Sequence, residues 1–145
     1  MIIAYCLLFS TTTRSIYQAN YSVRNGDFNY ALTNSVIGAN IGVRRIVMSK
    51  DKQKLYAFCF NHSVVVYIRG ENDRFVFSEK IDTGSGWVWA GCEDDCGNLY
   101  IACDEKVFVY SDGKTKLLKS FDTKVENLFF VPAKDKQKAM LLAAV

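Results

Sequence analysis

The sequence has little of what marks several other classes of protein. It contains one proline and one histidine in 145 residues, no low-complexity segment, and no apolar run long enough to cross a bilayer as a helix. No long segment repeats apolar residues at three-and-four spacing, which argues against a helical fold. Disordered and membrane-spanning classes are therefore disfavoured, and the periodicity that remains is typical of strands.

Charge of one sign is also scarce. The formal net charge is +3, and the basic residues are offset locally by acids, as in Glu93-Asp94-Asp95. No face of the chain therefore carries the basic stripe that follows a phosphate backbone, and we expect no nucleic-acid partner. By contrast, half of the residues are hydrophobic and 14% are aromatic, which is enough for the core of one domain or of part of one.

A five-residue sequence, KDKQK, occurs twice, beginning at Lys50 and at Lys134, 84 residues apart. If the chain is built from repeats, this separation is two units of about 42 residues. The apolar segments 55–59 and 99–103 support such a repeat, because both are followed by a polar turn and a second apolar segment. The KDKQK copies are expected at solvated hairpin turns, which explain them better than a binding patch does.

Each unit is expected to contain four strands. The first unit has them at 45–48, 55–59, 64–67 and 75–81, and the second at 87–90, 99–103, 107–110 and 116–121. A third unit starts at 125–131 and stops in its second strand, 139–145. The N-terminal segments 2–6, 15–21 and 28–32 fit as second, third and fourth strands of a further unit with longer turns.

Four antiparallel strands repeated about every 40 to 45 residues resemble the blades of a β-propeller. The segment EDDCGNLYIA, from Glu93 to Ala102, is similar to the hairpin of NHL-repeat and gluconolactonase-like propellers. Trp-Asp-repeat propellers are similar in the aromatic that ends the third strand, here Tyr67 and Tyr110, but the aspartate of their motif is missing. The resemblance implies an all-β fold of four-stranded antiparallel blades, without assigning a named family.

We predict a single partial propeller domain over residues 1–145. Its blades lie at approximately 1–40, 43–83 and 86–123, with an incomplete blade at 125–145. About three blades are fewer than the four or more of closed single-chain propellers. A fragment of a longer propeller is the favoured explanation, self-association to close the propeller is the second, and an open stack is the third.

The histidine and the cysteines offer little for catalysis. His62 lies in a predicted turn without a second histidine to share a metal ion. The cysteines are Cys6, Cys59, Cys92, Cys96 and Cys103. Cys6, Cys59 and Cys103 each lie at the end of a predicted second strand, where a buried thiol behaves as a small hydrophobe. The other two have three residues between them, which is not the spacing of zinc or redox pairs.

A metal site is the main alternative. The resemblance to gluconolactonase-like propellers implies a divalent cation such as calcium, held by acidic and amide side chains, and the candidates are Glu93, Asp95 and Asn98. The function would then be that of a fragment of a metal-dependent hydrolase. All three residues lie on one predicted hairpin, however, where turn chemistry alone explains them.

The preferred hypothesis rests on aromatic residues. It is that the chain is a non-catalytic binding module or scaffold, with no cofactor and with a protein partner. The candidate anchors are Trp87, Trp89, Tyr67 and Tyr110. Aromatic side chains are enriched in binding hot spots, although alternate residues of 87–90 are expected to pack between blades. Sugar recognition through the tryptophans is a third possibility that the sequence does not separate from the first.

The expected location is cytoplasmic, because an odd number of cysteines in this pattern favours reduced thiols. The alternative is a secreted chain, in which residues 1–9 form a signal peptide and Asn20 and Asn61 are glycosylation acceptors. A positive charge before the apolar run is missing and the run matches the repeat, so a strand is the preferred interpretation.

Overall fold

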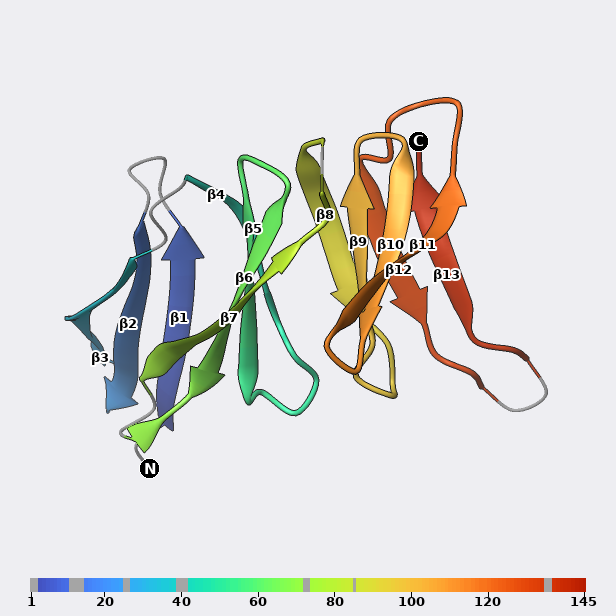
Figure 1. Cartoon of the computed structure of the whole chain (residues 1–145). Helices are drawn as coiled ribbons and strands as arrows, with labels where there is room; N and C mark the ends of the chain where they lie inside the picture. The colour runs from blue at the N-terminus through green and yellow to red at the C-terminus, as the bar shows by residue number, and fades with distance from the viewer. Residues whose placement is uncertain are drawn as a thin grey trace.

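The computed structural model describes residues 3–10, 15–24, 27–38, 42–71, 74–84, 86–134 and 137–145, with side chains described from residue 42 onward. Within these ranges the regular structure is almost entirely strand, arranged as four antiparallel sheets that follow one another from the N-terminus to the C-terminus (Figure 1). We call them sheets A, B, C and D. Among the described residues, no helix has the length and apolarity needed to cross a membrane.

Each sheet is formed by strands that are consecutive in the chain. Sheet A contains β1 (Ile3–Ser10), β2 (Ser15–Arg24) and β3 (Asp27–Gly38). Sheet B contains β4 (Val43–Met48), β5 (Lys54–Cys59), β6 (Ser63–Arg69) and β7 (Phe75–Asp82). Sheet C contains β8 (Val88–Glu93), β9 (Leu99–Cys103), β10 (Lys106–Ser111) and β11 (Lys114–Ser120). Sheet D is the hairpin of β12 (Asn127–Val131) and β13 (Met140–Ala144).

This arrangement confirms the prediction of an all-β fold with four-stranded antiparallel sheets, which is propeller-like. The first KDKQK copy forms the turn between β4 and β5, and the described residues of the second copy lie between β12 and β13. Lys52 in the first turn has a φ of 61°, a left-handed conformation that is common in tight turns. Both copies are therefore hairpin connections, as the repeat predicts.

The first strands of successive sheets lie next to one another. Strand β4 contacts β8, and β8 contacts β12. Strand β1 is an edge strand of sheet A and contacts β4. Second strands make the same kind of contact, because β5 contacts β8 and β9 contacts β12. The placement of residues 2–6 as a second strand therefore stays a prediction.

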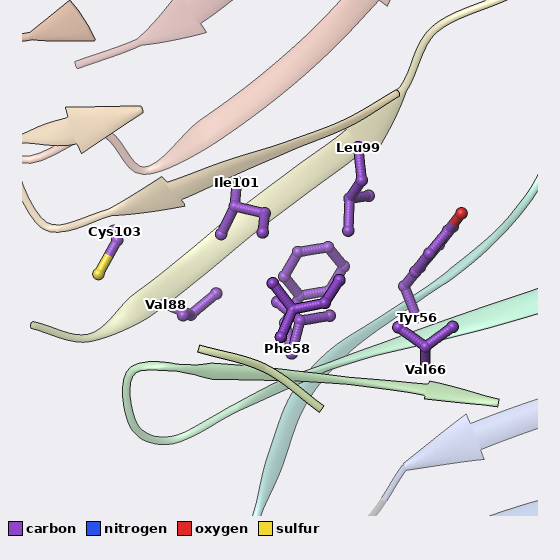
Figure 2. Close-up of a cluster of buried hydrophobic side chains, with 9 residues drawn as sticks. Tyr56, Phe58, Val66, Val88, Leu99, Ile101 and Cys103 are labelled. Carbon is purple, nitrogen blue, oxygen red and sulfur yellow. The ribbon is translucent and has the colours of Figure 1, made fainter. Parts of the chain in front are cut away.

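The main core lies between sheets B and C, where both sheets contribute apolar side chains (Figure 2). Phe58 of β5 is fully buried at its centre and is surrounded by Val66, Val88, Leu99 and Ile101. Strands β5 and β6 are buried on both faces, since a second cluster covers the other side of sheet B. This explains why their sequences are continuous apolar runs and do not alternate.

Two of the three cysteines predicted to pack as small hydrophobes do so. Cys59 ends β5 and Cys103 ends β9, and both thiols are buried, which raises their pKa. The side chain of Cys6 lies outside the described residues. Cys59, Cys92 and Cys96 are free thiols.

Candidate functional site

Two β-bulges at equivalent places in neighbouring strands bring an arginine and a tryptophan together. In β4 the pairing passes from Val43 opposite Cys59 to Arg45 opposite Phe58, which leaves Arg44 as the extra residue. In β8 it passes from Val88 to Ala90 in the same way, which leaves Trp89. A bulge bends the strand and changes the direction of the extra side chain. Arg44 and Trp89 are both half-buried, whereas the valine before each of them is buried.

Around these two residues lies what we call the aromatic–arginine cluster, formed by Arg44, Phe60, Trp87, Trp89 and Lys124. The guanidinium carbon of Arg44 lies 3.9 Å from the ring centroid of Trp89 and 4.5 Å from that of Phe60. It is also 5.9 Å from the ring of Trp87. The ammonium of Lys124 lies 4.0 Å from the Trp89 ring. Each such cation–π contact is worth about 0.5–2 kcal/mol, depending on how far it is desolvated.

Asp104, in the turn between β9 and β10, holds the side chain of Trp89 and the backbone of Trp87. The Nε1–H of Trp89 donates to Oδ1 of Asp104 at 2.9 Å, and the backbone N–H of Trp87 donates to Oδ2 at 3.0 Å. Gly86 makes this approach possible, because a Cβ there would lie 2.6 Å from Oδ2 and its φ is +85°. The one polar atom of the Trp89 side chain is thus satisfied, and its ring remains available for stacking.

The cluster combines exposed apolar surface with a cation that lacks an acidic partner. Trp87 is 51% exposed and Phe60 is 39% exposed. Arg44 forms no ion pair within the described part of the chain, and its buried Nε has no hydrogen-bond partner there. Among the described side chains, its positive charge therefore faces the aromatic rings of Trp89, Phe60 and Trp87.

The sequence identified only part of this cluster. Trp87 and Trp89 were predicted as anchors, whereas Arg44, Phe60, Lys124 and Asp104 were missed because they come from four other segments. A signal was present in the repeat itself. Val43-Arg44 and Val88-Trp89 begin two successive first strands, Val125-Glu126 directly precedes the next, and all three valines are buried. Aligning these pairs would have placed Arg44 beside Trp89.

The two predicted tyrosines have other surroundings. Tyr67 is 1% exposed and belongs to the core on the other face of sheet B, where it meets the edge of Phe77. It is therefore a packing residue and presents no ring to a partner. Tyr110 of β10 donates its hydroxyl to Glu79 of β7, and burial, followed by this carboxylate, raises its pKa to about 12. It links sheets B and C.

The acidic hairpin between β8 and β9 also links the sheets. Glu93 accepts hydrogen bonds from the hydroxyl of Tyr56 and the backbone N–H of Lys50, both at 2.8 Å. Asp95 pairs with the ammonium of Lys50, and the side chain of Asn98 donates to Asp94. Of the three candidate metal ligands, Glu93 and Asp95 are thus engaged with residues of sheet B, and Asn98 is engaged within its own hairpin. Across the residues that have described side chains, no group of three His, Cys, Asp or Glu is arranged to hold a metal ion.

Asp94 organises this hairpin. Its buried carboxylate accepts hydrogen bonds from the backbone N–H groups of Cys96 and Asn98, from the Asn98 amide and from the Tyr100 hydroxyl. Burial alone would raise the pKa of Asp94, but these hydrogen bonds outweigh it and hold the pKa below the usual 3.8. The carboxylate is a structural acceptor that shapes the turn.

We expect Asp94→Asn to lower the free energy of unfolding by about 1–3 kcal/mol at pH 7, because an amide cannot accept from all four donors. Since the pKa is depressed in the fold, the contribution of the charge is complete above the unfolded value of 3.8 and is lost as pH falls through the folded-state pKa. Urea unfolding at pH 7 and near pH 3 should therefore show the difference between wild type and variant shrinking in acid. Asp112→Asn, in an exposed turn, is the matched control, and an Asp94 effect independent of pH would contradict the assignment.

Comparison with known proteins addresses the fold. No protein-family model matches the chain, and no curated protein matches it significantly. Among solved structures, BBS1N in complex with ARL6DN matches with a TM-score of 0.64 at 16% identity, over 99% of this chain and 46% of that chain. The extracellular domain of the hybrid two-component system BT4673 from B. thetaiotaomicron matches with a TM-score of 0.48 at 16% identity, over 84% of this chain and 18% of that chain.

The first of these matches supports a fold of the propeller class. BBS1N is a β-propeller-containing domain, and the four antiparallel sheets of this chain superpose on part of it. The chain spans less than half of the length of BBS1N.

Proposed function

We propose that this chain is a non-catalytic, propeller-type binding module that presents the aromatic–arginine cluster to a protein partner. The observation that carries the proposal is the exposure of Trp87 and Phe60 beside Arg44, whose charge has no acidic partner in the described part of the chain. Trp and Arg dominate binding hot spots, because each joins a large contact area to a polar group. Asp104 holds the indole of Trp89 and the backbone of Trp87, which lowers the entropy cost of ordering this surface on binding.

Two further observations support a protein as the partner. BBS1N, which shares the fold, was crystallised in complex with ARL6DN, which is itself a protein. The carboxylates of the alternative metal site are engaged in contacts between sheets, which favours binding over metal-dependent hydrolysis. The proposal includes a cytoplasmic location with reduced thiols and closure of the propeller by further blades, with closure by a second copy as the alternative.

We expect Trp87→Ala to weaken binding of the partner by at least about 2 kcal/mol, roughly thirtyfold in Kd. The partner is first isolated by affinity capture with the wild-type chain, and its Kd is then measured by calorimetry with each variant. Phe129→Ala is the matched control, because Phe129 is an aromatic of similar exposure, 52%, on sheet D. Thermal unfolding verifies that both variants remain folded.

If Trp87→Ala captures the partner as well as wild type does, the proposal is contradicted. It is also contradicted if Trp87→Ala and Phe129→Ala lower the affinity for the partner equally. Arg44→Lys supplies a second probe of the same surface. It keeps the charge but removes the planar group that stacks on Trp89, so partner affinity should fall with little change in its dependence on salt.

A further inference from the structure

Strand β11 is an edge of sheet C. The order of the sheet is β11, β10, β9, β8, and within the described ranges β11 pairs only with β10. Every one of its residues is exposed. An edge of this kind presents a row of unpaired N–H and C=O groups that another extended chain can pair with.

A bulge gathers three lysines on one face of this strand. Lys114 lies opposite Ser111 and Lys116 lies opposite Val109. Between Phe108 and Val107 the register shifts, which leaves Leu118 as the extra residue and places Lys119 opposite Val107. Residues directly opposite one another share a face, and alternate residues of β10 share a face as well. Lys114, Lys116 and Lys119 therefore all lie on the face of sheet C to which Val107 belongs.

The lysine face is not covered by the neighbouring sheet. Val107 packs against Val125 and Leu128, which places sheet D on this side. Strand β11 is nevertheless exposed along its whole length. None of the three lysines forms an ion pair with any residue whose side chain is described.

The contact between sheets B and C shows how an outer strand of this fold meets its neighbour. On β7, the outer strand of sheet B, Glu79 lies opposite Val66, which faces sheet C, and it accepts the hydroxyl of Tyr110 from that sheet. On β11, the outer strand of sheet C, the corresponding face carries lysines. A segment that binds there must therefore supply acceptors, and anionic acceptors make the strongest hydrogen bonds to lysine.

We propose that β11 binds an extended, acidic segment of a protein partner, which adds to sheet C as a further strand and directs carboxylates to Lys114, Lys116 and Lys119. The inference rests on the proposed function and specifies the chemistry of a second contact with the partner. Lysines on an edge oppose pairing with another copy of the same strand, because like charges would face one another, whereas an acidic strand forms opposite-charge pairs. The positive charge of β11 thus favours an acidic strand of a partner over a second copy of this chain.

The probe is a short fluorescein-labelled peptide of alternating glutamate and valine, whose binding is followed by fluorescence anisotropy. The test variant is Lys114→Glu/Lys116→Glu/Lys119→Glu. The control is Lys52→Glu/Lys134→Glu/Lys138→Glu, which changes the net charge equally on exposed lysines of the two KDKQK turns. We expect the test variant to bind the peptide roughly tenfold or more weakly than wild type, and the control to stay within about twofold. Circular dichroism verifies the fold of both.

Two further probes test the mode of binding. The same peptide with alternate backbone amides N-methylated keeps its charge but cannot pair as a strand, so its binding should be lost. A short oligothymidylate tests whether the lysines respond to any polyanion; β11 carries no aromatic side chain for base stacking, so weaker binding than that of the peptide is expected.

Equal affinity of the test and control variants would overturn the proposal, and so would undiminished binding of the N-methylated peptide or tighter binding of oligothymidylate. Failure of the peptide to bind wild type would also overturn it, while leaving the proposed function intact if the captured partner still depends on Trp87. If neither the peptide nor a Trp87-dependent partner binds, the proposed function fails as well.

Discussion

Replacing Phe58 by alanine is expected to lower the free energy of unfolding by about 3–5 kcal/mol, the largest effect of any single substitution considered for this chain. The ring is 0% exposed and lies at the centre of the core between sheets B and C (Figure 2). Its removal takes away apolar contacts with both sheets and leaves a cavity. Strands β5 and β9 cannot close that cavity, because their backbones are fixed by hydrogen bonds on both sides.

Chemical unfolding monitored by tryptophan fluorescence would measure this change, since both tryptophans lie on or next to β8 of the same pair of sheets. Phe129→Ala, with its exposed ring, is the control and should cost less than about 1 kcal/mol. An equal effect of the two substitutions would mean that sheets B and C do not share a packed core.

The second large effect is expected for Gly91→Ala, in β8 on the facing sheet. A Cβ at this position would lie 2.4 Å from Cε1 and Cζ of Phe58 and 2.5 Å from the carbonyl oxygen of Tyr100. No such atom fits without displacing both the ring and the backbone of β9. We expect a loss of about 1–3 kcal/mol or more, caused by steric overlap and not by backbone conformation.

Gly70→Ala provides the comparison, because the nearest atom to its added Cβ lies 3.4 Å away. The combination of Gly91→Ala with Phe58→Leu then separates the two causes. The smaller leucine side chain should relieve the overlap with the ring, so the double variant should be more stable than the sum of the single effects predicts. The overlap with the Tyr100 carbonyl remains, and full recovery would contradict its contribution.

Much of the fold could be predicted from short stretches of the sequence. The strand at 99–103 was predicted with its observed bounds, and those around Val64, Phe75 and Val107 were predicted within about two residues at each end. Strand propensity and turn residues act over a few positions, so they are visible in one sequence. The repeat of about 42 residues then indicated that such strands form similar sheets.

The candidate site was predictable only in part, because its residues come from different strands. Trp87 and Trp89 were identified by type, but their partner Arg44 is brought to them by a bulge in another sheet. Tyr67 was predicted as an anchor from its type alone and is buried, because sheet B is covered on both faces. Side-chain type does not state which face of a strand meets a second sheet.

By itself, then, the sequence determined the strands, their hairpin turns and their repetition, because these depend on residues close together in the chain. The tertiary structure decided which side chains share a surface. Lys116 and Lys119 show the difference: their odd spacing places them on opposite faces of a regular strand, and the bulge at Leu118 places them on the same one. Register across strands is fixed by packing and pairing over long distances, and it therefore sets the surface that a partner meets.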